Sequence, residues 1–140
     1  MFPADTPLSV WLSWLETLSP KEINLGISRV QVVLSKLQII LPDKVILIAG
    51  TNGKGSCAAM IEALLRESGL KTGSYTSPHV INYNERIVLH GKPVDDCEII
   101  CAFEAIEAVR DGIELTYFEY GTLAALVIFA KSKLKEPVDI

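Results

Sequence analysis

The sequence predicts an α/β protein in which helices flank a parallel sheet, with a helical segment in front of it. Residues 45–49 form a short, continuous apolar run rich in β-branched side chains, which is typical of a strand buried in a parallel sheet. A glycine-rich loop follows at 50–56, then a helical stripe at 58–65 and a second extended run at 72–76. This order of strand, loop, helix and strand is a βαβ unit, which is expected to cross over right-handed.

Two helices are expected before the first strand. Residues 8–18 carry apolar side chains at helical spacing. Ser19 and Pro20 end that pattern, because the residue before a proline is pushed out of the helical region. A second helix is expected over 27–38, with one apolar stripe formed by Ile27, Val30, Leu34 and Leu37.

After the βαβ unit, the pattern predicts a short hairpin and two further helices. Residues 84–94 are typical of two short strands joined by a turn at 90–93. Helices are expected over 96–110 and 117–134, and the second is apolar along most of its length, which predicts a place in the core. The last residues of the chain are typical of the opening of another buried strand.

The composition indicates a globular protein and excludes several classes. Of the 140 residues, 49% are hydrophobic and 21% are charged, with a formal net charge of -4. These values argue against disorder. The net negative charge gives no general electrostatic attraction to nucleic acid or to an anionic membrane. The longest apolar run, residues 123–130, is far shorter than the ~20 residues that span a bilayer. The three cysteines, Cys57, Cys97 and Cys101, are an odd count that indicates reduced thiols in a cytoplasmic protein.

The strongest chemical signal is the sequence GTNGKGS at residues 50–56. Its glycines let backbone N–H groups approach phosphate oxygens, and the following helix points its positive end at them. Lys54 adds a mobile cation, and Ser56 offers a hydroxyl to a phosphate or to Mg²⁺. The loop departs from the usual phosphate-loop motif, since Ile48 replaces the first glycine and Gly55 follows the lysine. A plain strand-to-helix turn is the alternative. We favour nucleotide binding, because the strand, Lys54, Ser56 and the following helix all fall where a phosphate site needs them.

Four motifs together carry a resemblance to a known family. They are the loop GTNGKGS, the pair TSPH and NERI, the segment TYFEYGTL, and the N-terminal pair WLSWLE and INLG. In this order and spacing they resemble the bifunctional dihydrofolate synthase/folylpolyglutamate synthases of bacteria, members of the Mur-ligase superfamily. The resemblance implies a P-loop NTPase-like fold of the Mur-ligase central domain type, here incomplete. It also implies that residues 1–140 are the N-terminal part of the ATP-binding domain, with the C-terminal glutamate-binding α/β domain absent.

The resemblance implies an ATP-dependent amide ligase of folate biosynthesis. ATP phosphorylates a carboxylate of the pteroate or folate substrate, and the amine of L-glutamate then attacks the acyl phosphate, leaving an amide. The implied substrates are dihydropteroate and tetrahydrofolate. The implied cofactors are ATP and Mg²⁺, with a monovalent cation as a further candidate. The full-length enzyme is expected to be a cytoplasmic monomer without nucleic-acid or membrane partners.

The resemblance also assigns site residues. The ATP-binding loop of the family is matched by Thr51, Asn52, Gly53, Lys54, Gly55 and Ser56. Lys54 is the implied catalytic residue, and Ser77 matches a serine that ligates Mg²⁺. Segments that contact the pterin-bearing substrate are matched by Thr116, Tyr117, Phe118 and Glu119, and, with a differing local sequence, by Thr17, Leu18, Ser19 and Pro20.

Several of these residues have a structural alternative. Ser77 precedes a proline, where a turn serine bonds only local backbone. Thr116 and Glu119 open an apolar run as T-x-x-E, which predicts a capping box in which each side chain bonds the other's backbone N–H. Tyr117 and Phe118 would be core aromatics without the family match. Such a box is compatible with substrate contact by these two rings.

Two other functions compete with the ligase. A non-catalytic ATP-binding module of the same fold would hold ATP without turnover. A small kinase would need the full phosphate-loop motif and an arginine-rich lid, which the sequence lacks. We expect the 140 residues alone to be inactive, because the family's further metal ligands and second domain lie beyond Ile140. We also expect an open sheet edge and uncovered apolar helix faces to make this piece prone to aggregate or to pair with another chain. The roles of His79 and Arg86, and whether one or both activities are present, stay open.

Overall fold

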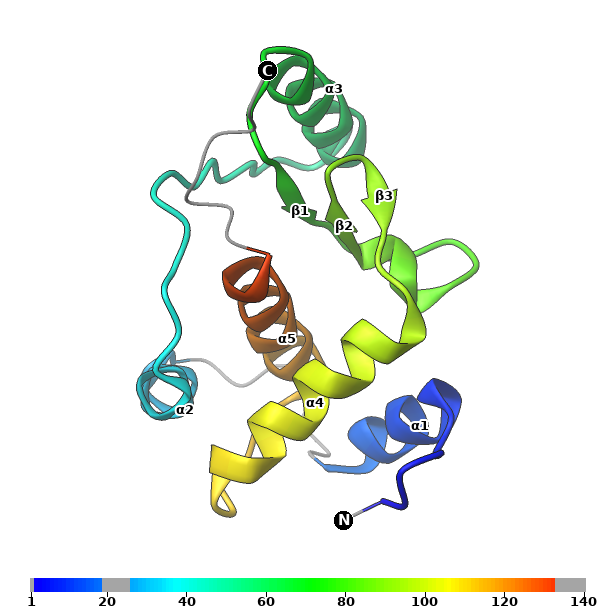
Figure 1. Cartoon of the computed structure of the whole chain (residues 1–140), viewed down its shortest axis with the longest axis vertical. Coiled ribbons are helices and arrows are strands. Elements are labelled where there is room, and N and C mark those ends of the chain that lie inside the picture. Colours follow the sequence, from blue (N-terminus) through cyan, green and yellow to red (C-terminus); the bar gives the residue numbers. More distant parts are fainter. Residues whose placement is uncertain (1, 19–25, 133–140) are drawn as a thin grey trace. The chain divides into compact units, whose positions relative to one another are not determined.

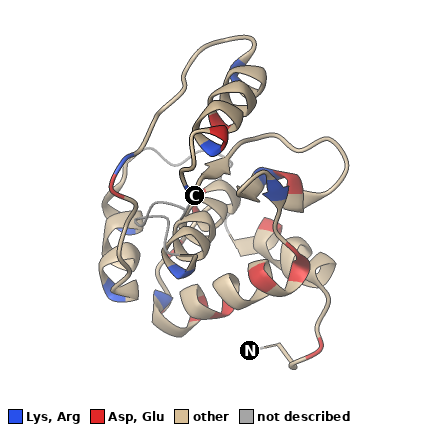
Figure 2. Cartoon of the chain, turned by 45° about the horizontal axis from the view of Figure 1, so that its top comes forward, with Lys and Arg blue, Asp and Glu red and all other residues tan. Residues whose placement is uncertain are grey.

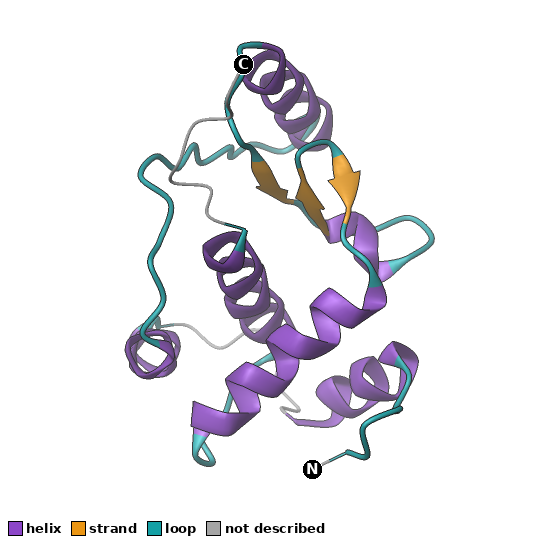
Figure 3. Ribbon diagram, in the orientation of Figure 1, coloured by secondary structure: helices purple, strands orange, loops and turns teal. Residues whose placement is uncertain are grey.

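The structure is a computed structural model, and it describes residues 2–18 and 26–132 of the chain. The chain divides into two compact units (Figure 1). The first combines residues 1–39 with 96–128, and the second combines residues 40–95 with 129–140. Among the described residues, strands occur only in the second unit (Figure 3). Each unit is described by itself.

The first unit is built from helices around an aromatic core. It contains α1 (Leu8–Leu18), α2 (Ser28–Leu37), α4 (Asp96–Arg110) and most of α5 (Tyr117–Lys131). Both α1 and α2 pack against α4. Trp11 lies against Phe103 with ring centroids 5.9 Å apart, and Phe103 lies against Tyr120 at 5.3 Å. All three rings are buried, so the core of this unit lies where α1, α4 and α5 meet.

The helices of this unit follow the sequence patterns closely. The expectations for α1 and α4 are confirmed with the same bounds, and α5 begins where expected, with its described part ending at Lys131. The buried face of α4 is formed by Ile99, Ala102, Phe103 and Ile106. Acidic residues recur along this helix (Figure 2), and Asp96, Glu98 and Glu104 among them are exposed. The expected stripe of α2 is wrong in part, because Ile27 is 68% exposed and Val33 is the buried residue of that helix.

The second unit combines one helix with a small antiparallel sheet. It contains α3 (Lys54–Glu67), β1 (Gly73–Tyr75), the short 3-10 helix η1 (Tyr83–Arg86), β2 (Ile87–Leu89) and β3 (Lys92–Pro93). The strand order is β1-β2-β3, and the register pairs Gly73 with Leu89 and Val88 with Pro93. The turn at His90 and Gly91 joins β2 to β3, so two short strands joined by a turn are present as expected. The expected turn at 90–93 is wrong in part, because Lys92–Pro93 is itself the second strand, and residues 84–86 belong to η1.

The expected strand at residues 45–49 is wrong in the described structure. This segment pairs with no strand, and Val45 and Leu47 are 77% and 90% exposed. A strand persists only where a neighbouring backbone completes its hydrogen-bond ladder and its apolar faces are covered. The first condition is not met, because β1 pairs antiparallel with β2 and not with residues 45–49. The second is not met either, because no residue of α3, the helix that follows this segment, is buried against it. The expected parallel pairing is therefore absent from the described residues.

The α/β fold class itself holds. The described part is rich in helices and carries a small sheet of three strands. The strand expected at 138–140 lies outside the described residues. No helix in the described part of the chain is both long and apolar enough to cross a membrane.

Candidate functional site

The glycine-rich loop at residues 50–56 leads directly into the first turn of α3. Gly53 has a positive φ of 76°, a conformation that favours glycine, and the helix begins at Lys54. The first bond of the helical ladder runs from the N–H of Cys57 to the carbonyl of Gly53 at 3.0 Å. The preceding N–H groups have no intrahelical acceptor, and no side chain caps this helix end. The loop therefore presents backbone donors at the positive end of a helix.

The loop is open around these donors. All residues from Thr51 to Ser56 are exposed, and a Cβ placed on Gly53 or Gly55 would meet nothing within 4 Å. The ammonium of Lys54 donates a hydrogen bond to the carbonyl of Gly50 at 2.5 Å. The cation thus folds back over the loop, where it lies close to the helix N-terminus. This geometry suits an anionic group such as a phosphate.

Ser77 lies two residues after the end of β1 and is exposed. The backbone of its neighbour Thr76 donates to the carbonyl of Arg86 at 2.9 Å, and the Ser77–Pro78 peptide bond is cis. The guanidinium of Arg86 donates to Nδ1 of His79 at 2.8 Å and lies 5.2 Å from the centroid of the Tyr83 ring. His79 and Arg86 are therefore part of the framework of the loop that follows Ser77.

Glu85 fixes the same loop from its other end. Its carboxylate accepts the backbone N–H groups of Asn82, Val80 and Ile81 at 2.6, 2.9 and 3.0 Å. These three hydrogen bonds, the one from Asn82 first, lower the pKa of the Glu85 carboxyl. Glu85 thus holds the backbone of residues 80–82 in place.

The Ser77 hydroxyl could hold a metal ion together with a nucleotide. The Ser77 hydroxyl is an oxygen donor, which is the type that Mg²⁺ prefers. No group of three or more His, Cys, Asp or Glu side chains in the described part of the chain could hold a metal ion. Mg²⁺ often binds through few protein oxygens together with phosphates and water, so a site that combines Ser77 with a nucleotide is chemically reasonable.

A second group of predicted residues lies in the first unit, at the start of α5. Thr116 is buried, and its hydroxyl accepts the N–H of Glu119 at 3.2 Å. This is one half of the expected capping box. The expected other half is wrong, because Oε1 of Glu119 accepts a hydrogen bond from Arg29 at 2.7 Å instead of one from the backbone of Thr116. Attraction between the two charges decides the orientation of the carboxylate.

The aromatic residues of this segment differ in exposure. Tyr117 is half-buried, whereas Phe118 is 51% exposed. The end of α1 lies close by, since the ring of Trp14 contacts that of Tyr120 at 6.3 Å. Thr17 follows one turn later, and its hydroxyl donates to the carbonyl of Trp14 at 2.7 Å.

The end of α1 is covered only in part by the structure. Leu18 is half-buried and is the last residue of the helix. Ser19 and Pro20 lie outside the described residues. The phosphate loop and Ser77 belong to one unit, and the segments at Thr17 and Thr116 belong to the other.

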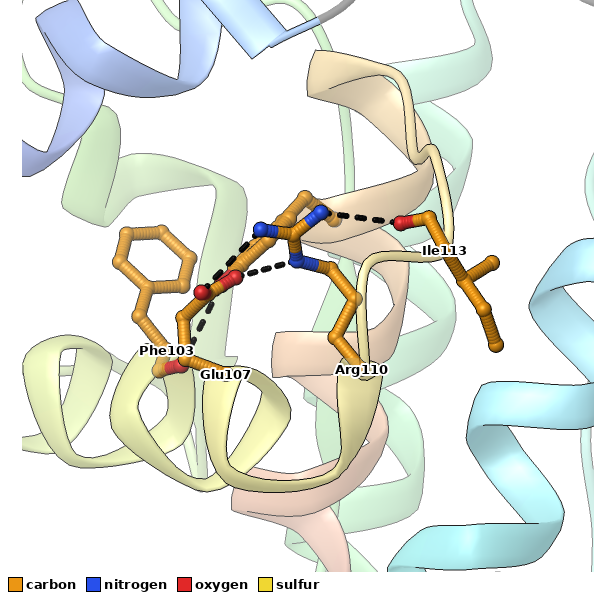
Figure 4. A network of polar contacts seen from close by, with 5 residues as sticks. Phe103, Glu107, Arg110 and Ile113 are labelled. Carbon is orange, nitrogen blue, oxygen red and sulfur yellow. Dashed lines mark hydrogen bonds and ion pairs between the residues drawn. The ribbon is translucent and has the colours of Figure 1, made fainter. Parts of the chain in front are cut away.

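Sequence reasoning missed a buried polar network beside the start of α5 (Figure 4). Glu107 accepts hydrogen bonds from Arg110 and from the hydroxyl of Tyr120, the latter at 2.7 Å. Arg110 also donates to the carbonyl of Ile113 at 3.0 Å. The spacing of Glu107 and Arg110 on one helix was the available signal. No local pattern indicated that Tyr120 would join them.

The chain is similar to the dihydrofolate synthase/folylpolyglutamate synthases. No family model matches the chain. The Escherichia coli (strain K12) protein of that name is 43% identical over 132 residues, which are 94% of this chain and 31% of that protein. The chain therefore spans about a third of the length of the curated relatives that it matches.

Solved structures agree with this likeness. The structure of E. coli FolC in complex with DHPP and ADP matches with a TM-score of 0.89 and 41% identity, over 94% of this chain and 32% of that one. A bifunctional folylpolyglutamate synthase/dihydrofolate synthase with Mn, AMPPNP and L-glutamate bound matches with a TM-score of 0.88 and 41% identity, over 96% of this chain and 32% of that one. This chain thus corresponds to the N-terminal part of the dihydrofolate synthase/folylpolyglutamate synthases.

Proposed function

Since the chain corresponds to the N-terminal part of a dihydrofolate synthase/folylpolyglutamate synthase, we propose that it belongs to an ATP-dependent amide ligase of folate biosynthesis. The whole protein would add L-glutamate to dihydropteroate and to tetrahydrofolate, in the cytoplasm and as a monomer. The observation that supports this most is the likeness over 94% of the chain to E. coli FolC, a protein whose structure holds DHPP and ADP. The exposed donors at the start of α3 give that likeness a chemical basis.

The phosphate loop is the proposed ATP site. Its backbone N–H groups between Thr51 and Ser56 would bind phosphate oxygens, and the helix end would stabilise their charge. Lys54 would leave the carbonyl of Gly50, which it contacts in the structure, and bind the β- and γ-phosphates. There it would neutralise the charge that develops on the transferred group. Asn52 and Gly55 complete the loop on either side of Gly53.

Mg²⁺ is the proposed metal, held by the hydroxyls of Ser77 and Ser56 together with the nucleotide. Bound there, it would supply a positive charge next to the transferred phosphoryl group. The bonds that fix the loop after Ser77, from Glu85 and Arg86, would hold the serine in place. A similar protein solved with Mn, AMPPNP and L-glutamate bound supports a site that takes a divalent metal and a nucleotide.

The segment at the start of α5 is the proposed site for the pterin-bearing substrate. Phe118, which is 51% exposed, would pack its aromatic ring against a flat heterocycle. Tyr117, Thr116 and Glu119 would shape the rest of the contact. The end of α1, with Thr17 and Leu18, would lie on the same side of the unit, because Trp14 and Tyr120 bring the two helices together.

The proposed reaction has two steps. A carboxylate oxygen of the folate substrate attacks the γ-phosphorus of ATP, which forms an acyl phosphate and releases ADP. The amine of L-glutamate then attacks the acyl carbon, loses a proton and expels inorganic phosphate, which leaves the new amide. A carboxylate is a poor electrophile, and phosphorylation supplies the leaving group that it lacks. The protein contributes mainly by positioning the groups and stabilising charge.

We propose the following division of the whole protein. Residues 1–140 form the N-terminal part of the ATP-binding domain, and a C-terminal α/β domain that helps to bind glutamate is contributed by the rest. Because this chain spans about a third of the length of its relatives, the 140 residues alone would not catalyse the reaction. A non-catalytic ATP-binding module is the second candidate, and the open donors of the phosphate loop would serve it equally.

An activity assay tests the proposal. The full-length protein is incubated with ATP, Mg²⁺, dihydropteroate and L-glutamate, and the new amide is measured by mass together with released phosphate. We expect both products in a one-to-one ratio, and no product from the 140-residue chain alone. Nucleotide binding by the full-length protein without any amide product would instead favour the non-catalytic module.

A further inference from the structure

Arg29 makes two hydrogen bonds to the segment that leads into α5. It lies in the first turn of α2, far from that segment in sequence. One guanidinium nitrogen donates to the carbonyl of Glu114 at 2.8 Å, and another donates to Oε1 of Glu119 at 2.7 Å. The side chains of Arg29 and Glu119 are 23% and 13% exposed, so the ion pair is largely shielded from solvent.

One acceptor precedes the proposed substrate-binding segment, and the other belongs to its last residue. Glu114 precedes Leu115 and Thr116, which are both buried, and Glu119 ends the four residues assigned to substrate contact. The guanidinium is planar, so its two donors have a fixed geometry relative to each other. One side chain therefore fixes the start and the end of this segment at the same time.

The ion pair also leaves one oxygen of Glu119 unused. Oε1 bonds Arg29, while Oε2 is buried and has no hydrogen-bond partner among the described residues. Buried carboxylate oxygens almost always have a donor, so one without a donor calls for an explanation. A pterin ring carries N–H groups that could donate to such an oxygen.

We propose that Arg29 is a positioning residue for the pterin-bearing substrate. It holds Glu119 in the orientation that presents Oε2 to an N–H group of that substrate, and it fixes the backbone at Glu114. This inference rests on the proposed function, because it names the substrate of the same site. Arg29 acts through Glu119 and the backbone, and does not itself contact the substrate.

Steady-state kinetics of the full-length enzyme test this role. Arg29→Met removes both donors, and we expect the KM for dihydropteroate to rise about tenfold, the usual size for a lost charge-assisted contact. The KM for ATP should stay within about twofold, because ATP binds at the loop around Lys54. Lys36→Met is the matched control, since Lys36 lies on the same helix and forms an exposed pair with Asp111 at 3.9 Å. It should leave both KM values unchanged.

Two further variants separate positioning from stability. Arg29→Lys keeps the charge but reaches one acceptor at a time, and it should recover part of the affinity for dihydropteroate. In a Glu119→Gln background, Arg29→Met should change the KM for dihydropteroate far less than in the wild type, because both substitutions act through one carboxylate.

Specific outcomes would overturn the inference. Equal increases in both KM values, or a lower melting temperature with neither KM changed, would show a merely structural ion pair. Full additivity of the two substitutions would also overturn it. If Arg29→Met does not fold, the same criteria apply to Arg29→Lys and Glu119→Gln. A failure of the proposed function would be seen separately, as absence of amide product from the wild-type enzyme.

Discussion

The hydroxyl of Tyr120 donates a hydrogen bond to Oε1 of Glu107 at 2.7 Å, which joins α5 to α4 within the first turn of α5 (Figure 4). Arg110 holds the same carboxylate and lies 5.8 Å from the centroid of the Trp14 ring on α1. Three helices of the first unit are thus tied together next to the residues proposed to contact the substrate. The stability of this network can be tested independently of catalysis.

Removing the hydroxyl should destabilise the protein. Tyr120→Phe leaves the ring in the core but takes one donor from a largely buried carboxylate, for which we expect a loss of about 1–2 kcal/mol in the free energy of unfolding. Urea unfolding of the full-length protein, followed by Trp fluorescence, measures it. Glu104→Gln on the exposed side of α4 is the control and should change the midpoint little. An unchanged midpoint for Tyr120→Phe would contradict the role given to this bond.

The same tyrosine predicts a loss of stability at alkaline pH. Burial raises the pKa of Tyr120 above its ordinary value of 10.0, and the hydrogen bond with the negative Glu107 raises it further. A raised pKa in the folded state means that the stabilisation is complete below about pH 10 and is lost as the pH rises beyond it. Unfolding midpoints between about pH 8 and 11 should therefore fall more for the wild type than for Tyr120→Phe. If the midpoints of the wild type and Tyr120→Phe fell equally with pH, ionisation of Tyr120 would be excluded as a cause of the loss of stability.

Glu62 predicts a loss of stability in acid. Burial works to raise the pKa of its carboxyl, but hydrogen bonds from Thr72 at 2.7 Å and Arg66 at 3.1 Å outweigh it, and the pKa is lowered from 4.5. The stabilisation is present above about pH 4.5 and disappears as the pH falls through the lowered pKa of the folded state. Glu62→Gln should reduce the difference between unfolding midpoints at pH 7 and pH 4. Glu67→Gln is the control, because Glu67 is exposed on the same helix, and it should leave the difference between the two midpoints unchanged.

How far the sequence predicted the structure depended on the distance between interacting residues. The bounds of α1 and α4, and the presence of two short strands joined at Gly91, follow from local periodicity and turn chemistry, although the expected turn at 90–93 was two residues too long. The capping box at Thr116 was half right, because Arg29, about 90 residues away, takes the carboxylate that a local argument gives to the backbone. The network of Glu107 and Tyr120 was missed for the same reason. Local patterns do not encode which distant charge will lie next to a helix end.

The segment at 45–49 shows a different limit. Its apolar, β-branched composition is that of a buried strand, but composition cannot supply the neighbouring strand that completes the ladder. In the described structure Val45, Ile46 and Leu47 are exposed and unpaired with any strand. The glycine loop that follows keeps its predicted relation to α3 nevertheless, because the positive φ of Gly53 and the helix start at Lys54 are local.

Ser77 should affect how the full-length enzyme responds to Mg²⁺. Ser77→Ala removes the proposed hydroxyl ligand, so the Mg²⁺ concentration that gives half-maximal activity should rise several-fold, while saturating Mg²⁺ restores part of the rate. Ser68→Ala is the control, because the Ser68 hydroxyl bonds the carbonyl of Leu64 at the far end of α3. Identical Mg²⁺ titrations for Ser77→Ala and the wild type would favour the turn serine over the metal ligand.

Lys54 should affect the chemical step rather than the folding of the enzyme. Among residues 2–18 and 26–132, its ammonium bonds the carbonyl of its own loop, at 2.5 Å and exposed to solvent, so its loss should change the unfolding midpoint little. As the proposed cation on the transferred phosphoryl group, it should matter for the rate, and Lys54→Ala should lower kcat by about 10²-fold or more. Lys44→Ala, an exposed lysine before the loop, is the matched control and should keep full activity. Phosphate release by the full-length enzyme measures both variants. Normal kcat for Lys54→Ala would count against the phosphate-loop assignment, because no other lysine or arginine lies within residues 45–65 to replace it.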